Sequence, residues 1–547
     1  MKRRMLSLMG AAAILLSVLP GCGGGGGETA SSQAQPAQNG EDGPLAAYEE
    51  PLKVSQMLEV DAGTVYADGE SLDDNIITRF YKEKLNIEYD FAWQVDSANY
   101  AEQLDLAIAS NNDLPDQFIA NKAQIYNLSQ AGQIADMTQY YEEYASDNLK
   151  EVLSFNDNEG FESATVDGKL YGLPLTNDVG DGASLIFVRK DWMDRLNLEE
   201  PKTLDDLIAM AQAFVDNDMS GSGNTIGLGL ASDLGFTFDV FANAYGAYPD
   251  LWIDDGSGSL VYGSTQPAVK EGLLKLQEVY SKGLIHQEFA AQDVTRIAQM
   301  VAQGRLGIMI GPFWYNDLYL TSNMKADPEA EWVAYSALPA KEGELVATRA
   351  WNTTYRWLVV NANYSNPEAA VKQMNLWYEM WQGEYADWFW ENKLSDTYYE
   401  IDLKEYCPVF FDPPLKNIQL GASLREALES KDPSGLNPEG MYNYEAMVTP
   451  KADSDPAVNK SRTLTWEGSF KILNDQYENF VYDQYRGPHT TLYSSRKSLL
   501  KDLETDAFVR IIMGEDISTF DSFVEQWKSA GGTDVTNEVN QWYQSQQ

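Results

Sequence analysis

Apolar residues recur along this chain in two patterns, the helical period and the short unbroken runs that are typical of buried strands. The first pattern predicts helices at 75–85, 100–109, 203–214, 265–283, from 366 onward and at 520–543, with a break at 531–532. The second predicts strands at 185–188, 306–310 and 357–360. Strands and helices that alternate in this way imply an α/β fold.

Cap residues mark the ends of several predicted helices. Thr203 and Asp206 have the spacing of a capping box. Thr265 is expected to cap the helix that Gly283 ends, since glycine readily adopts the left-handed conformation of a helix stop. Asn366 is expected to cap a later helix, because proline follows it in the first turn.

The N-terminus combines a basic start with an apolar run that is too short to span a bilayer. Three basic residues at 2–4 precede the run at 5–19, which ends in the sequence LPGC at 19–22. A small residue followed by cysteine at this place resembles the lipobox of bacterial lipoproteins. In those proteins the cysteine is acylated and becomes the new N-terminus.

We therefore expect a lipoprotein signal peptide at 1–21, lipid attachment at Cys22 and a flexible tether over 22–50. The tether is rich in Gly, Ser, Gln, Ala and Pro and lacks apolar periodicity. The alternative is an ordinary cleaved signal peptide that happens to contain a cysteine. In either case the mature protein is expected outside the cytoplasm.

Charge narrows the range of partners. The chain has 547 residues and a formal net charge of -44, which repels nucleic acid and anionic membrane surfaces. The same charge argues against a polyanionic ligand, although Arg189, Arg349 and Arg356 leave room for a local exception. The chain has two histidines, which argues against zinc sites and histidine-based catalytic triads.

Aromatic residues point towards carbohydrate. They make up 12% of the chain, with 14 Trp and 31 Tyr, and flat aromatic faces bury the apolar face of a sugar ring. The alternative for any single ring is a place in the core. Cys407 has no disulfide partner once Cys22 carries lipid, and we expect it to be a buried apolar residue rather than a nucleophile.

Several segments together resemble the family 1 extracellular solute-binding proteins, in their long Gram-positive lipoprotein branch. The segments are 167–174 (DGKLYGLP), 189–192 (RKDW) with the capped helix after it, 302–309 (AQGRLGIM), 311–314 (GPFW), 366–370 (NPEAA), 508–514 (FVRIIMG), 523–527 (FVEQW) and 540–543 (NQWY). The likeness covers most of 51–547 and is weakest at 395–465, a proline-rich irregular stretch.

The resemblance implies a two-lobed, type II periplasmic-binding-protein-like α/β fold with hinge strands between the lobes. Ligand would bind in the cleft between them. The expected divisions are lobe 1 at 51–174, lobe 2 at 175–340, a return to lobe 1 at 341–395, and an irregular elaboration with C-terminal helices, mainly in lobe 2, at 396–547. An elaboration of this kind packs on the surface or over a cleft, and the sequence leaves both open.

Loops at the carboxyl ends of strands are expected to line the cleft. The candidate ligand-binding residues are Trp93, Asn121, Thr176, Asn177, Asp178, Phe236, Tyr245, Tyr248, Phe313, Trp314, Trp351 and Arg356. Among them Trp314 is the favoured stacking platform for a sugar ring. The alternatives are core positions for the aromatic rings and an ordinary turn for Asn177 and Asp178.

Some relatives of the family carry a calcium loop after the capped helix. The corresponding stretch here, 218–227 (DMSGSGNTIG), lacks carboxylates at two odd positions and is about two residues short of the pattern that calcium needs. We expect a Gly-Ser turn at this place, and no metal or other cofactor.

The resemblance implies the substrate-binding component of an ABC importer, anchored by lipid to the outer face of the cytoplasmic membrane of a Gram-positive bacterium. It would bind an oligosaccharide as a monomer, pass it to the ABC permease subunits and do no covalent chemistry. One alternative is a surface glycoside hydrolase, which needs two carboxylates about 5 to 10 Å apart. Another is a receptor for peptide or another small polar solute.

Overall fold

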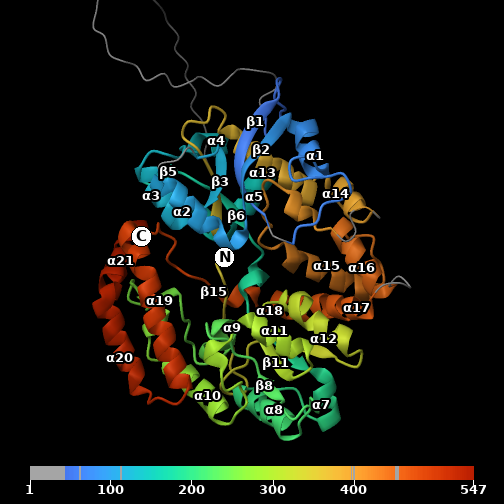
Figure 1. The fold of residues 1–547 in the computed structure, drawn as a ribbon, viewed down its shortest axis with the longest axis vertical. Helices are drawn as coiled ribbons and strands as arrows, with labels where there is room; N and C mark the ends of the chain where they lie inside the picture. The colour runs from blue at the N-terminus through green and yellow to red at the C-terminus, as the bar shows by residue number, and fades with distance from the viewer. Residues whose placement is uncertain (1–42, 61–62, 111–113, 396, 398–400, 450–454) are drawn as a thin grey trace, which may run out of the picture. The chain divides into compact units, whose positions relative to one another are not determined.

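Two mixed β-sheets organise the chain, and each lies against hydrophobic core clusters of its own (Figure 1). The computed structural model describes residues 43–547 except 61–62, 111–113, 396, 398–400 and 450–454. The expected signal peptide, Cys22 and most of the expected tether lie outside the described residues. The described chain belongs to one compact unit, 39–547.

The first sheet has five strands in the order β2-β1-β3-β14-β6. Its strands β1, β2 and β3 run parallel, and β14 is antiparallel to both β3 and β6. Strand bounds are β1 Leu52–Glu59, β2 Ile87–Val95, β3 Gln117–Ala120, β6 Leu173–Thr176 and β14 Thr354–Val360. The chain therefore returns to this sheet late, through β14.

The second sheet has four strands in the order β12-β7-β11-β8. Strand bounds are β7 Leu185–Arg189, β8 Ile226–Leu228, β11 Leu306–Gly311 and β12 Trp332–Tyr335. Three short pairs complete the strands, β4 Thr165–Val166 with β5 Lys169–Leu170, β9 Trp252–Asp254 with β10 Leu260–Tyr262, and β13 Thr348–Arg349 with β15 Phe480–Val481.

Helices pack on the core of one sheet or the other because each buries an apolar face. Those on the first core are α1 Ile76–Leu85, α2 Tyr100–Ser110, α3 Lys122–Gln130, α4 Thr138–Tyr144, α5 Asp147–Leu153, α6 Phe155–Ala164, α13 Glu368–Trp381 and α14 Ala386–Lys393.

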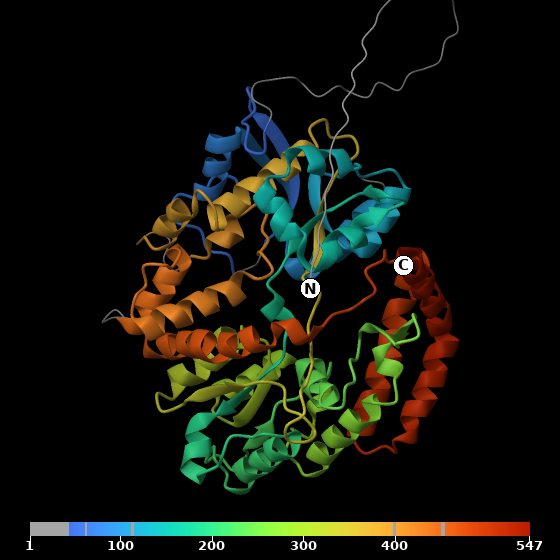
Figure 2. The same cartoon turned by 180° about the vertical axis from the view of Figure 1, so that it is seen from behind.

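The second sheet takes the remaining helices on two core clusters. Their bounds are α7 Lys190–Leu196, α8 Leu204–Asp216, α9 Gly235–Asn243, α10 Val269–Ser281, α11 Val294–Ala302, α12 Thr321–Ala326, α15 Lys416–Ser430, α17 Pro456–Thr463, α18 Phe470–Gln476, α19 Thr491–Ile512, α20 Ser518–Trp527 and α21 Thr533–Gln546. Helix α16 (Pro438–Val448) packs on α15 and α17. Figure 2 shows α19, α20 and α21 side by side.

The predicted strands and most helix ends are confirmed. The backbone N–H of Thr203 donates to the Asp206 carboxylate at 2.9 Å, and the two residues form the predicted capping box. Gly283 follows the last turn of α10 with φ of +71°, the left-handed conformation that ends a helix. The break at 531–532 is also present, with φ of +121° at Gly531.

Two cap predictions are wrong. Helix α10 begins at Val269, and the Thr265 hydroxyl donates to the carbonyl oxygen of Tyr262 at 2.8 Å in a separate short turn. Helix α13 begins at Glu368, and the Asn366 side-chain amide contacts the Glu368 carboxylate at 3.4 Å rather than capping the helix. In both cases the polar residue satisfies a local turn instead of the helix end.

The irregular stretch after 395 divides between the two sheets. Leu403, Tyr406 and Cys407 are buried in the core of the first sheet, whereas Ala457 and Leu464 are buried with the second. Within the described residues we find no helix with the length and apolarity to cross a membrane.

Candidate functional site

A pocket of about 340 Å³ lies where the first sheet meets the segment after β6 and the irregular stretch after 395. Its volume is at the small end of the range of about 300–1,000 Å³ that is usual for ligand pockets. The lining residues are Leu58, Glu59, Ser97, Ile119, Asn177, Asp181, Arg356, Asp402, Lys404, Glu405, Cys407, Pro408, Phe410 and Asp412.

The first sheet supplies a charged pair to this pocket. Glu59 is the last residue of β1, and Arg356 comes from β14. The Arg356 guanidinium donates to the Glu59 carboxylate at 3.0 Å. The Nε atom of Arg356 is buried without a hydrogen-bond partner among the described residues.

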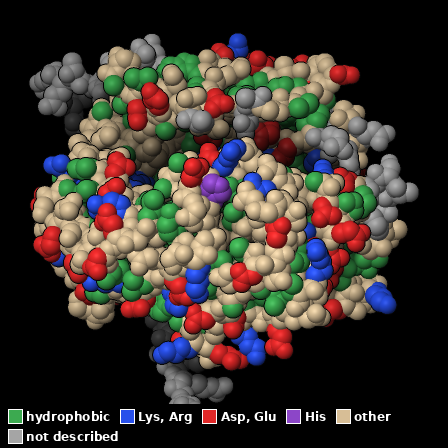
Figure 3. Space-filling view, turned by 60° about the horizontal axis from the view of Figure 1, so that its bottom comes forward, with side chains coloured by type: hydrophobic (Ala, Val, Ile, Leu, Met, Phe, Trp, Pro, Cys, Tyr) green, Lys and Arg blue, Asp and Glu red, His purple; other side chains and the backbone are tan. Residues whose placement is uncertain are grey.

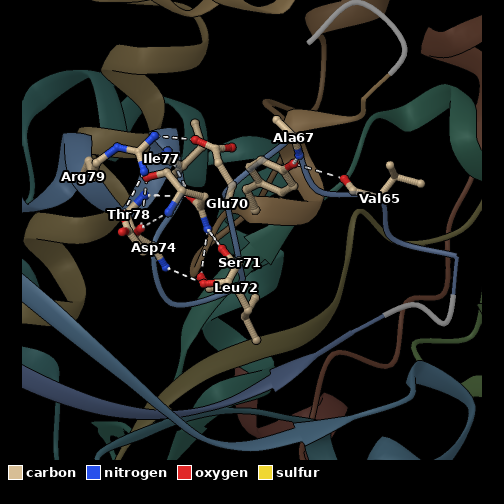
Figure 4. Close-up of polar contacts among 11 residues, drawn as sticks. Val65, Ala67, Glu70, Ser71, Leu72, Asp74, Ile77, Thr78 and Arg79 are labelled. Atoms are coloured by element: carbon tan, nitrogen blue, oxygen red, sulfur yellow. Dashed lines mark hydrogen bonds and ion pairs between the residues drawn. The ribbon is translucent and has the colours of Figure 1, made fainter. Parts of the chain in front are cut away.

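A tyrosine holds one wall of the pocket in place. The Tyr406 hydroxyl donates to the carbonyl oxygen of Val65 at 3.0 Å and accepts from the backbone N–H of Ala67 at 2.9 Å (Figure 4). Its ring stacks on Tyr66 with centroids 5.0 Å apart. These contacts fix the short turn Leu403–Tyr406, and with it the lining residues Lys404 and Glu405.

The loop that receives Tyr406 is itself tied to the start of α1. Asn75 caps this helix, accepting from the backbone N–H groups of Ile77 and Thr78 at 3.0 and 2.9 Å (Figure 4). The Arg79 guanidinium bridges the carboxylates of Asp74 and Glu70. These contacts within 65–79 tie the loop that receives Tyr406 to the start of α1, so the loop can act as a fixed support for Tyr406.

Asp412 closes the other side of the irregular segment. The backbone N–H of Asp412 donates to the carbonyl oxygen of Thr176 at 2.8 Å, and the Thr176 hydroxyl donates to the carbonyl oxygen of Asp412 at 2.7 Å. The indole N–H of Trp381 donates to the Asp412 carboxylate at 3.0 Å. Thr176, a predicted ligand residue, is buried in this contact, where it holds the lining residue Asp412 in place.

The crossing between the sheets runs at 177–184, and its first residues are held by hydrogen bonds. Asn177 lines the pocket, and its side-chain amide donates to the carbonyl oxygen of Thr353 at 3.1 Å. The Asp178 carboxylate accepts from the backbone N–H groups of Gly180 and Asn417 at 2.9 and 2.8 Å. With 3% exposure, Asp178 fixes the crossing to α15 rather than lining the pocket.

Asp181 combines exposure to the pocket with an unusual proton affinity. Burial, and next the negative charge of Asp412, raise the pKa of Asp181 to about 7. Burial and then the charge of Asp181 raise the pKa of Asp178 well above its ordinary value. The pocket therefore has a negative character that Lys404 and Lys416 reduce only in part.

Aromatic side chains of the second sheet surround this crossing. The Trp314 indole N–H donates to the carbonyl oxygen of Asp181 at 3.1 Å. Trp351, 40% exposed, lies with its ring centroid 5.2 Å from that of Phe236. Any side chain at Gly182 would collide with Trp351, so the close approach requires glycine there. Phe313 packs on Phe470, with centroids 4.7 Å apart.

Of the twelve predicted site residues, only Asn177 and Arg356 line this pocket; Trp314 and five others lie around the crossing, and four lie elsewhere. Asn121 caps α3, accepting from the backbone N–H groups of the next turn, and Trp93 packs against the first core from β2. Tyr245 and Tyr248 follow α9, and Tyr245 packs against the second core near the charges of α8 and α10. None of the four is among the lining residues.

Sequence reasoning missed most of the charged lining. Asp181 lies only three residues beyond the predicted Asn177-Asp178 pair, so a longer window at the crossing would have included it. The segment 402–412 gave no such signal, because several of its contacts are to residues more than 300 positions away. Phe410 is the aromatic ring that this segment adds to the pocket lining.

The pocket suits a polyhydroxylated ligand. Carboxylates and amides are strong partners for hydroxyl groups, and an aromatic ring covers an apolar face. Cys407 also lines the pocket, and burial raises its pKa well above the ordinary value, which disfavours the nucleophilic thiolate. Its predicted burial is confirmed.

The loop at 218–227 is held by its own polar groups. The Asp218 carboxylate accepts from the backbone N–H of Gly223 and the hydroxyl of Thr225, each at 2.8 Å. These hydrogen bonds lower the pKa of Asp218. Across the described residues no three His, Cys, Asp or Glu side chains gather as metal ligands. The absence of bound calcium stays a prediction.

Comparison with known proteins identifies a family match over most of these elements. The family described as bacterial extracellular solute-binding protein matches residues 63–379, which is more than half of the chain. Lipoprotein LipO of Bacillus subtilis is 22% identical over 84% of this chain and 86% of its own length. The polygalacturonan/rhamnogalacturonan-binding protein YtcQ of the same organism is 25% identical over the same shares.

A solved structure shows the same fold. The Streptococcus pneumoniae ABC-transporter substrate-binding protein FusA, an EF-hand mutant in complex with fructo-nystose, superposes with a TM-score of 0.60 at 18% identity. The match covers 90% of this chain and 99% of that one. The expected type II periplasmic-binding-protein-like α/β fold is thereby confirmed.

Proposed function

The chain belongs to the bacterial extracellular solute-binding protein family, and on that premise we propose that it is the carbohydrate-binding component of an ABC importer. The proposed ligand is an oligosaccharide. The observation that carries the proposal is the pocket itself, whose lining brings together the Asn177 amide, the Asp181 carboxylate and the Arg356 guanidinium beside the ring of Phe410.

This set of groups binds without needing to react. Sugar hydroxyls both donate and accept, so they can satisfy a carboxylate and a guanidinium at once, while a ring face covers the C–H groups. Two similar proteins support carbohydrate as the ligand class, since one is named for binding polygalacturonan and rhamnogalacturonan and the other was solved with fructo-nystose. Binding and release of an unaltered sugar is the proposed activity, and we propose no enzymatic step.

We also propose that Cys22 carries the lipid that holds the protein at the outer face of the membrane of a Gram-positive bacterium. A relative named as a lipoprotein supports this placement. From there, as a monomer, the protein would pass its ligand to the permease subunits. Metabolic labelling with a palmitate analogue tests the anchor, because Cys22→Ala should abolish incorporation of the label.

A panel of neutral and charged oligosaccharides, read by intrinsic tryptophan fluorescence, tests the proposed ligand class. Trp351 is exposed beside the crossing and Trp314 contacts Asp181, so a bound sugar should change the emission. Saturable binding of at least one oligosaccharide supports the proposal. Binding of peptides alone would contradict it.

A further inference from the structure

We propose that the sugar held in this pocket is uncharged or positively charged, and that uronic acid residues are rejected. The inference rests on the proposed function and narrows its substrate class. It also separates this protein from its relative that is named for binding polygalacturonan, an anionic polymer. The evidence is that the candidate arginines each already pair with a carboxylate and that Lys404 rests on aromatic rings, together with the charges that line the pocket.

The three arginines that the sequence left open as an anion site are each occupied by a carboxylate. Arg189 makes a two-pronged contact with Asp191, with both N–O distances 2.8 Å. Arg349 lies 2.7 Å from Asp239. Arg356, which lines the pocket, lies 3.0 Å from Glu59. Each guanidinium is therefore partly neutralised by a carboxylate of the protein, which leaves less positive charge to attract a uronate.

Lys404 is the second cation of the pocket lining, and it too is engaged. Its ammonium lies 4.8 Å from the ring centroid of Trp381 and 5.0 Å from that of Phe410. Asp402 and Glu405 line the pocket beside it. A cation that rests on two rings between two acidic neighbours offers little net attraction to another carboxylate.

Carboxylates outnumber cations in the lining. Five acidic residues face two basic ones, and the acidic ones are Glu59, Asp181, Asp402, Glu405 and Asp412. The upward shift of the Asp181 pKa agrees with this balance, since burial and Asp412 outweigh the nearby lysines. Above about pH 7, where Asp181 is ionised, a uronate placed beside it would add a further like charge in a poorly solvated site, which costs binding energy.

The face in Figure 3 gives no sign of a compensating basic surface. Asp and Glu side chains are spread over it with Lys and Arg scattered among them. With a net charge of -44 on the chain, approach of a polyuronide is disfavoured before it reaches the pocket. Hydroxyls and ammonium groups meet no such barrier, because both donate hydrogen bonds to carboxylates.

Calorimetric titration with matched ligands tests the inference. Each neutral oligosaccharide that binds is compared with the same oligosaccharide after its primary hydroxyls are oxidised to carboxylates. Oligogalacturonides are compared with their methyl esters. We expect each acidic form to bind at least about tenfold more weakly, as like-charge contact predicts. The difference should shrink at high salt, whereas a purely steric rejection would not depend on salt.

Asp181→Asn supplies the variant for this test. Measured at about pH 8, above the Asp181 pKa of about 7, it removes one lining charge and keeps the shape of the side chain, so the ratio between neutral and acidic ligands should fall by about threefold or more. Asp502→Asn, which removes an exposed charge on α19, should leave the ratio unchanged.

Tighter binding of the acidic forms would overturn the inference while leaving a carbohydrate receptor in place. Failure of every oligosaccharide to bind would instead overturn the proposed function and, with it, this inference. An unchanged ratio in Asp181→Asn, together with no dependence on salt, would show that charge is not the cause of selection.

Discussion

The indole Nε1 of Trp314 lies 3.1 Å from the backbone carbonyl oxygen of Asp181 and donates a hydrogen bond to it. Trp314 follows a strand of the second sheet, and Asp181 faces the pocket at the edge of the first. This contact therefore connects the turn after β11 to the lining residue whose pKa is raised to about 7.

Trp314→Ala is expected to weaken oligosaccharide affinity at least about tenfold, or ~1.4 kcal/mol. The change removes both a half-buried ring and the hydrogen bond that positions Asp181. Thermal stability should change little, because the side chain is not fully buried. Trp314→Phe, which keeps a ring but lacks the N–H, is the control and should lose less affinity. Unchanged affinity with a large drop in melting temperature would show a core residue instead.

Stability should respond to pH through Asp181. Its pKa of about 7 in the folded protein exceeds the ordinary value of 3.8, so folding favours the protonated form. The stabilisation is complete below about pH 3.8 and is lost as the pH rises through about 7. Asp181→Asn cannot ionise, and its melting temperature should rise relative to the wild type between about pH 5 and about pH 8. A difference that stays flat over this interval would contradict the shifted pKa.

Asp178→Ala should destabilise the protein by about 1–3 kcal/mol, because one buried and one partly buried backbone N–H group lose their acceptor. Those groups belong to Gly180 and Asn417, so the loss would loosen α15 from the crossing. Asp178→Asn keeps one acceptor oxygen and should cost less. Denaturant unfolding measures both variants, and equal stability of all three proteins would refute the structural role of this carboxylate.

Calcium should have no effect on stability. The Asp218 carboxylate is already satisfied by the backbone of Gly223 and the hydroxyl of Thr225, and the loop offers few other charged oxygens. Melting curves with millimolar calcium and with a chelator should therefore coincide. A rise in melting temperature with calcium that Asp218→Asn abolishes would establish a metal site.

The elements that the sequence predicted best are those with local signals. The capping box of Thr203 and the stop at Gly283 depend on residues within one turn, and both are present. Thr265 failed as a cap because its hydroxyl finds a nearer carbonyl in a separate turn. Strand-end reasoning also led to Arg356 and Asn177, which line the pocket.

The remaining lining residues depend on distant contacts that no local pattern encodes. Tyr406 places Lys404 and Glu405 by bonding Val65 and Ala67, more than 300 residues earlier. A proline-rich stretch with no apolar period gives no hint of such pairing. Asp178 shows the converse case, since its turn-like sequence did signal the structural role that the hydrogen bonds assign to it.

Recovery of the ligand after binding tests the central claim most directly. Purified protein would be incubated with a labelled oligosaccharide that it binds, separated from free sugar, then denatured, and the released sugar analysed by mass. We expect close to one equivalent per chain, with the mass of the sugar unchanged after prolonged incubation. Shortened products that accumulate beyond one equivalent would contradict a receptor and indicate a hydrolase.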